Sequence, residues 1–189
     1  KRRLLQERLE ELEARAASGT ARAAILFIDL DHFKAINDNY GHKAGDAVLM
    51  AVSQRLRGCV RECDLVARVG GDEFVLVVEG VDRPQAAQLA SRLIQCISQP
   101  LEVFGRTVKV GASAGFALLP DDGRVADDLL RRADAALLAA KRLGRGTALD
   151  ARVIPLSAAV CTPCAVSLGS CPRTETAASY PDAGPSAAA

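Results

Sequence analysis

Two acidic clusters occur where the sequence predicts that a strand ends or turns. Asp29 and Asp31 follow a short apolar run, and Asp72 and Glu73 follow two consecutive glycines. Crowded carboxylates repel one another, and a divalent cation removes that repulsion. Hard oxygen ligands of this kind suit Mg²⁺ bound to a nucleoside triphosphate. Each cluster alone is also typical of solvated turn residues, but the two together favour metal-assisted phosphoryl transfer.

Small and basic residues that suit a phosphate accompany these clusters. Gly70 and Gly71 lack a Cβ, so a planar group or a phosphate can approach the backbone closely there. Lys34 follows the first acidic cluster, and Lys141 and Arg145 lie at the end of a predicted helix. Cations at that position could meet phosphates, although they also stabilise the helix dipole without any ligand.

The elements that must position these residues alternate between strands and helices. The pattern predicts helices over 3–16, 33–39 and 126–142, helices opening at Asp46 and Pro84, and strands over 23–28, 65–69, 74–78, 101–104, 107–118 and 147–149. This order resembles the split βαβ sandwich of ferredoxin-like and cyclase-palm domains. We therefore expect an α+β fold, with a central antiparallel sheet, helices packed on one face, and a β-hairpin carrying the turn at 70–73.

Composition limits the classes of partner. The chain has 189 residues, is 49% hydrophobic, and carries 24 basic against 23 acidic residues, for a net charge of +1. This balance argues against a nucleic acid polymer or an anionic membrane surface as partner. There is no apolar run long enough to span a membrane, so we expect no membrane contact. The sequence begins without Met, which we interpret as a piece of a longer protein.

A change of composition near residue 150 predicts a boundary. Residues 151–189 hold four charged residues, five of the eight prolines and ten alanines. Such a low-complexity segment is typical of disorder, so we expect the folded domain over 1–150 and a disordered tail over 151–189. Cys161 and Cys164 form a C-x-x-C pair within the tail. It is either half of a zinc site or two incidental thiols; no His lies beyond His42, which favours the thiols.

Several blocks, in order and at family spacing, resemble the GGDEF domain of bacterial diguanylate cyclases. The blocks are 27–34 (FIDLDHFK), 37–38 (ND), 41–46 (GHKAGD), 68–74 (RVGGDEF), 113–117 (SAGFA) and 133–145 (ADAALLAAKRLGR). The resemblance covers about residues 1–150. A block that normally precedes the domain is absent, and Lys1 stands about where it ends, so we expect a truncated N-terminal edge.

The resemblance implies an activity and its cofactor. Two GTP molecules condense to cyclic di-GMP and two pyrophosphates at the interface of a homodimer, in the cytoplasm or in the cytoplasmic part of a membrane-tethered sensor. Mg²⁺ or Mn²⁺ is expected on Asp29, the Leu30 carbonyl, Asp72 and Glu73. The implied catalytic residues are Asp29, Asp72 and Glu73, with Glu73 also the expected base for the 3′-hydroxyl group.

The resemblance also implies the groups that bind GTP. Asn37 and Asp46 match the residues that read guanine. A carboxylate acceptor suits the N1–H and N2–H₂ donors of guanine and would repel the acceptor N1 of adenine, so Asp46 favours GTP. The other implied contacts to GTP are Phe33, Lys34, Gly71, Lys141 and Arg145.

A second site is implied upstream of the acidic turn. Arg61 and Asp64 form an R-x-x-D pair in the register where the family places product inhibition, and Arg92 matches a secondary arginine. Arg can hold guanine or phosphate of cyclic di-GMP, and Asp can accept from guanine. The alternative is a surface ion pair, worth at most about 1 kcal/mol.

Two other interpretations remain open. One is a non-catalytic GGDEF module that binds GTP or cyclic di-GMP and regulates a fused domain; the retained Asp72 and Glu73 favour the enzyme. The other is a more distant polymerase-palm or adenylyl-cyclase relative, which would not share Asn37 together with Asp46.

Overall fold

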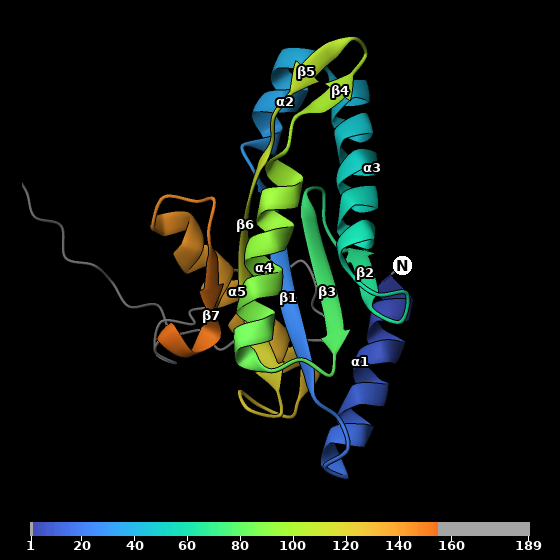
Figure 1. The fold of residues 1–189 in the computed structure, drawn as a ribbon, viewed down its shortest axis with the longest axis vertical. Coiled ribbons are helices and arrows are strands. Elements are labelled where there is room, and N and C mark those ends of the chain that lie inside the picture. The colour runs from blue at the N-terminus through green and yellow to red at the C-terminus, as the bar shows by residue number, and fades with distance from the viewer. Residues whose placement is uncertain (1, 155–189) are drawn as a thin grey trace, which may run out of the picture.

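The computed structural model describes residues 2–154 (Figure 1). Its elements in chain order are α1 (Arg2–Ala17), β1 (Ala23–Asp31), α2 (Phe33–Tyr40), α3 (His42–Cys59), β2 (Leu65–Arg68), β3 (Glu73–Glu79), α4 (Arg83–Ser98), β4 (Leu101–Val103), β5 (Arg106–Val108), β6 (Gly111–Leu119), α5 (Ala126–Arg142), β7 (Ala148–Asp150) and the 3₁₀ turn η1 (Ala151–Val153).

The central sheet has the strand order β2-β3-β1-β6-β7. Neighbouring strands run antiparallel except β6 and β7, which run parallel. The predicted α+β class with a central, mainly antiparallel sheet is therefore confirmed. The predicted hairpin is also present, because β2 pairs with β3 across the turn at residues 70–72.

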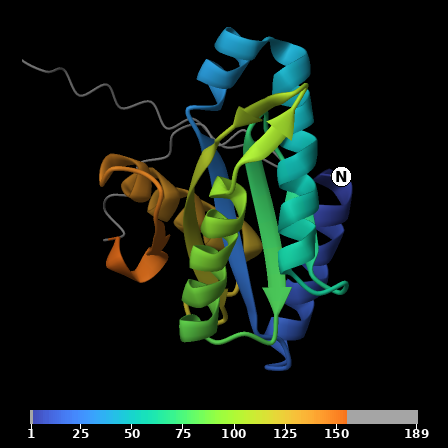
Figure 2. The ribbon, with the colours of Figure 1, turned by 45° about the horizontal axis from the view of Figure 1, so that its top comes forward.

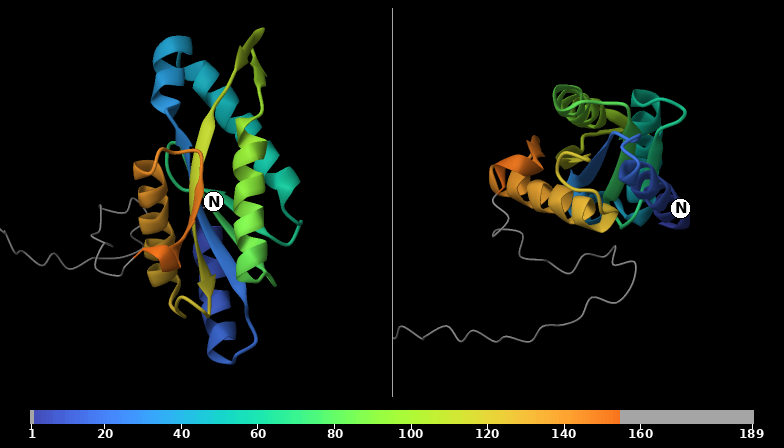
Figure 3. Two further views of the ribbon diagram at one scale, coloured as in Figure 1. Left: turned by 60° about the vertical axis from the view of Figure 1, so that its left-hand side comes forward. Right: turned by 90° about the horizontal axis from the view of Figure 1, so that it is seen from below.

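Helices cover both faces of the sheet, so the expectation of helices on one face is wrong. Leu26 and Ile28 of β1 pack with α3 and α4 in one core, whereas Ile25 and Phe27 pack with α1 and α5 in a second core. Figure 3 shows these two helical layers on either side of the strands. Every residue of β1 is buried. A strand covered on both faces is continuously apolar and does not alternate, which explains the unbroken apolar run in its sequence.

The single strand expected over 107–118 is two strands in two different sheets. β5 pairs with β4 as a separate hairpin, and β6 begins at Gly111. This hairpin lies beside α2 and the neighbouring end of α3 (Figure 2), with the Arg106 guanidinium 5.9 Å from the centre of the Tyr40 ring. Lys109 and Val110 belong to neither strand, although the β-prone residues continue through them.

The helix expected to open at Asp46 begins one turn earlier, at His42. Gly41 has a φ of 82° and joins α2 directly to α3. Its carbonyl accepts hydrogen bonds from the N–H groups of Ala44 and Gly45 at 3.0 and 3.2 Å. Glycine adopts a positive φ without steric cost, so a one-residue corner replaces the longer loop that the sequence indicated.

The described structure continues a few residues past the expected boundary at residue 150. In η1 the Asp150 side chain accepts from the Arg152 N–H, and Ala151 is buried in the core beside α5. The remainder of the expected tail, with Cys161 and Cys164, lies outside the described residues.

Candidate functional site

The two acidic clusters meet at one end of the central sheet. Asp29 and Glu73 are register partners where β1 and β3 pair. The Leu30 N–H donates to the Asp72 carbonyl at 3.2 Å, which holds the hairpin turn against the end of β1. The expected metal ligands, Asp29, the Leu30 carbonyl, Asp72 and Glu73, are thereby brought to one place.

Burial and repulsion from neighbouring carboxylates make Asp29 and Glu73 costly to ionise. Asp29 is only 8% exposed. Burial raises its pKa above the ordinary value, the Lys141 ammonium opposes the shift, and Asp72 adds to it. The pKa of Glu73 is raised by burial first and then by Asp29, Asp72 and Asp134. The site therefore concentrates negative charge that a cation would offset.

Two cations from the end of α5 approach the acidic residues. Lys141 Nζ lies 2.7 Å from Asp29 Oδ1, and Arg145 Nε lies 3.8 Å from Asp31 Oδ1. Asp31 also accepts from Ser113 Oγ at 2.9 Å and from the Gly146 N–H at 3.2 Å. Lys141 and Arg145 thus stand at the site, but both pair with carboxylates here.

The sequence interpretation did not identify Ser113, Gly146 and Asp134 as site residues. Ser113 Oγ and the Gly146 N–H both donate hydrogen bonds to the Asp31 carboxylate. Asp134 lies on α5, and burial raises its pKa while Lys141 opposes the shift. The available signal was its spacing of seven residues before Lys141, which places both on one face of a helix.

The donors at the site fit a hard divalent cation by their chemistry. All of them are oxygens, the type that Mg²⁺ and Mn²⁺ prefer. As they stand, residues 2–154 contain no group of three or more His, Cys, Asp or Glu side chains poised to hold a metal ion. The Glu73 carboxylate lies against Gly70, where a Cβ would come within 2.3 Å of Oε2, and Lys141 covers Asp29. A cation at Asp29 would have to displace the Lys141 ammonium, which lies 2.7 Å from Asp29 Oδ1.

Three of the residues expected to bind GTP, including the two expected to read guanine, lie where α2 meets α3. Phe33 is buried, Asn37 is half-buried and Asp46 is exposed. Phe33 and Asn37 both lie against Gly45 on α3, the neighbour of Asp46 in the chain.

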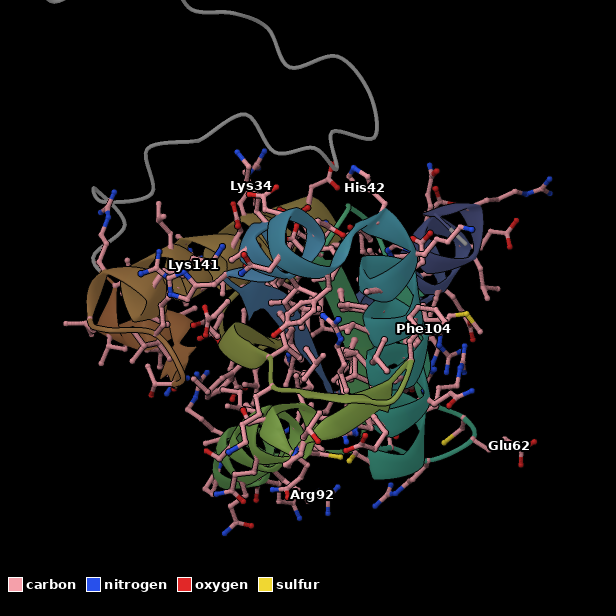
Figure 4. The ribbon with its side chains drawn as sticks, turned by 90° about the horizontal axis from the view of Figure 1, so that it is seen from above. Lys34, His42, Glu62, Arg92, Phe104 and Lys141 are labelled. Carbon is pink, nitrogen blue, oxygen red and sulfur yellow. The ribbon has the colours of Figure 1, made fainter. Side chains whose placement is uncertain are left out.

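The remaining expected GTP contacts lie toward the same end of the molecule. Lys34 on α2 is exposed, and nothing occupies the space where a Cβ of Gly71 would lie. Figure 4 shows Lys34 and Lys141 toward one side, on α2 and α5, with Arg92 toward the opposite side on α4.

The residues of the expected second site line a separate cavity of about 530 Å³ at α3 and α4, which includes Arg61, Asp64 and Arg92. Asp64 is buried and accepts from the Arg61 backbone N–H at 2.8 Å. Arg92 donates to the Cys59 carbonyl at 2.7 Å. Within the described residues no ion pair joins the side chains of Arg61 and Asp64. The surface ion pair considered as an alternative to a binding site does not form.

Lys141→Met is expected to raise the affinity for Mn²⁺ in the absence of nucleotide by about three- to ten-fold. The Lys141 ammonium competes with a metal ion for the Asp29 carboxylate, and a neutral side chain of similar length removes that competition. Isothermal titration of Mn²⁺ measures the change. Lys43→Met, which removes the same charge from an exposed position on α3, is the control. Equal or weaker Mn²⁺ binding by Lys141→Met would show that Lys141 does not compete for the site.

The fold and the site together define a class: a mixed α+β domain in which a hairpin turn presents carboxylates beside an acidic end of the central strand. The family model described as "Diguanylate cyclase, GGDEF domain" matches residues 1–147. The chain therefore belongs to the GGDEF family.

Relatives and solved structures agree with this assignment. The bifunctional diguanylate cyclase/cyclic di-GMP phosphodiesterase MucR of Pseudomonas aeruginosa is 47% identical over 144 residues, which cover 76% of this chain and 21% of MucR. The crystal structure of the GGDEF domain of TpbB from the same species has a TM-score of 0.74 at 38% identity, covering 78% of this chain and 92% of that one. The GGDEF domain of DgcB from Caulobacter crescentus, solved in complex with c-di-GMP, has a TM-score of 0.74 at 28% identity, covering 80% and 90%.

None of the helices within residues 2–154 is both long enough and apolar enough to cross a membrane.

Proposed function

We propose that this chain is a diguanylate cyclase domain that condenses two GTP molecules into cyclic di-GMP and two pyrophosphates. The observation that supports this most is the intact acidic turn. Asp72 and Glu73 are held against Asp29 by strand pairing and by the bond from the Leu30 N–H to the Asp72 carbonyl. Two of the similar proteins are named for cyclic di-GMP synthesis or were solved with c-di-GMP bound.

The reaction joins the 3′-hydroxyl group of each GTP to the α-phosphorus of the other. Each 3′-oxygen forms a bond to phosphorus while the bond from that phosphorus to pyrophosphate breaks, and the hydroxyl proton is lost. Each domain binds one GTP, so two copies of the chain must face each other. Asp29, the Leu30 carbonyl, Asp72 and Glu73 would hold Mg²⁺ or Mn²⁺, which when bound acidifies a hydroxyl group and offsets phosphate charge.

The chain's own residues have separate tasks in this proposal. Glu73 accepts the proton of the 3′-hydroxyl group. Its pKa is raised toward neutral pH, which makes it a stronger base than an ordinary carboxylate. The phosphates of GTP are contacted by Lys34, Lys141 and Arg145. For this contact, Lys141 and Arg145 leave their carboxylate partners, Asp29 and Asp31. Asn37 and Asp46 read the guanine edge.

Incubation of the purified chain with GTP and Mg²⁺ tests the proposal directly. We expect cyclic di-GMP and pyrophosphate, identified by chromatography and mass spectrometry, and no product from ATP. The oligomeric state is measured on the same sample. A dimeric sample that binds GTP without forming product would overturn the catalytic proposal and identify a non-catalytic binding module.

We further propose that the cavity at Arg61, Asp64 and Arg92 binds the product and inhibits the reaction. Arg61→Ala is expected to raise the concentration of cyclic di-GMP needed for half-inhibition by about ten-fold or more, because a guanidinium contact to guanine or phosphate is lost. The initial rate at increasing cyclic di-GMP measures the effect. Glu62→Ala is the matched control, since Glu62 follows the cavity-lining Arg61 in the chain but projects outward from the surface (Figure 4). Inhibition that is unchanged in Arg61→Ala would remove this second site.

A further inference from the structure

Gly45 lies in a contact that a side chain would destroy. A Cβ at this position would come 1.9 Å from Asn37 Oδ1 and 3.2 Å from the Cζ atom of Phe33. Gly45 is buried and helical, and its φ is not in the left-handed region. Its backbone conformation therefore does not call for glycine, and what the missing side chain provides is space for its neighbours.

Backbone hydrogen bonds at the junction of α2 and α3 hold Gly45 close to the end of α2. The Gly41 N–H donates to the Asn37 carbonyl at 2.8 Å, and the Gly45 N–H donates to the Gly41 carbonyl at 3.2 Å. These bonds tie the end of α2 to the first turn of α3 across a single residue. Asp46 follows Gly45 directly in the chain, so the two residues expected to read guanine, Asn37 and Asp46, both adjoin this glycine, as does Phe33.

We propose that Gly45 is a positioning residue for base specificity. Because Gly45 has no side chain, the Asn37 amide and the Phe33 ring can pack against its Cα, next to Asp46. This inference rests on the proposed function, because the base concerned is the guanine of GTP. The displaced atom would be the end of a flexible Asn side chain and not the backbone. An added methyl group is therefore expected to turn the amide away and leave the helices in place.

The consequence is a selective loss. Gly45→Ala should weaken recognition of the base while leaving recognition of the triphosphate intact, because the phosphate cations come from Lys34, Lys141 and Arg145. A generally damaged fold would weaken both. The informative measurement is therefore the ratio of the affinity for the nucleotide to the affinity for the triphosphate alone.

Isothermal titration in the presence of Mg²⁺ tests this with three probes: 3′-deoxy-GTP, 3′-deoxy-ATP and inorganic tripolyphosphate. The two deoxynucleotides keep base and phosphates but lack the nucleophilic hydroxyl group, so no turnover occurs. We expect Gly45→Ala to bind 3′-deoxy-GTP about ten-fold more weakly or worse, to lose preference over 3′-deoxy-ATP, and to bind tripolyphosphate within about two-fold of the unchanged chain.

Gly58→Ala is the matched control. Gly58 lies in the same helix, and a Cβ there would meet nothing within 4 Å. It borders the cavity beside Arg61, so it serves as a control for binding of 3′-deoxy-GTP and for stability only. We expect its affinity for 3′-deoxy-GTP to be unchanged.

The outcomes separate this inference from the proposed function. If the unchanged chain prefers 3′-deoxy-GTP and Gly45→Ala retains that preference, the role of Gly45 is overturned and the GTP proposal stands. If the unchanged chain does not bind 3′-deoxy-GTP, both are overturned.

A second variant covers the case in which Gly45→Ala unfolds at a lower temperature. Adding Asn37→Ala removes the atom nearest to the new methyl group. Recovery of the Tm to that of Asn37→Ala alone would support the contact between Gly45 and Asn37. A Tm that stays low would place the steric conflict elsewhere and overturn the inference.

Discussion

Glu73→Gln is expected to lower the rate of cyclic di-GMP formation by at least about 1000-fold. Glutamine keeps the size and the position at the start of β3, but it can neither accept a proton nor offer a full negative charge. The substitution therefore removes both the proposed proton acceptor and one expected ligand of the metal ion. Product formed at saturating GTP, with Mg²⁺ and separately with Mn²⁺, measures the change. Glu10→Gln, on the exposed side of α1, should leave the rate unchanged.

Stability provides the second readout for this substitution. Because the pKa of Glu73 is raised in the folded state, its ionised form favours the unfolded chain. The folded state therefore loses stability as the pH rises from the unfolded pKa of about 4.3 through the higher pKa of the folded state. In metal-free buffer at pH 7, Glu73→Gln is therefore expected to unfold at an equal or higher temperature. That gain should vanish below about pH 4. A variant that is stable and still forms product at more than about a tenth of the normal rate would contradict the role of Glu73 as base.

Gly115→Ala is expected to lower the free energy of unfolding by about 3 kcal/mol or more. A Cβ on Gly115 would come 2.0 Å from the Ala133 carbonyl oxygen and 2.3 Å from the Leu137 nitrogen. Both atoms belong to the backbone of α5, which cannot rotate aside as a side chain can. The helix must shift away from β6, and buried apolar contacts are lost.

Urea unfolding followed by circular dichroism measures this loss, and Gly58→Ala is again the control, expected to be neutral or slightly stabilising. Lys141 lies near the end of α5, so a Gly115→Ala chain that still folds should also form less cyclic di-GMP. A loss below about 1 kcal/mol would mean that the two elements can separate at little cost.

The sequence predicted most elements because their signals are local. The helix over 126–142 was placed at its observed bounds, since its apolar periodicity and the glycine after it lie in adjacent residues. The single strand expected over 107–118 is two strands, because the interruption at Lys109 and Val110 lies within a continuous β-prone run and leaves no mark in local propensity. The sequence does not predict that α3 begins at His42. The one-residue corner depends on the positive φ of Gly41, and a glycine is equally compatible with a longer loop.

The candidate site divides in the same way. The acidic residues, the glycine turn, Asn37 and Asp46 can be recognised from the sequence, because each lies in a short block of neighbouring residues. Only the folded domain shows that Lys141 pairs with Asp29, that Ser113 donates to Asp31, and that Gly45 lies against Asn37. The first two contacts join segments far apart in the chain and the third depends on the angle between two helices. Local sequence patterns specify none of these three contacts, because packing of the whole domain brings the atoms together.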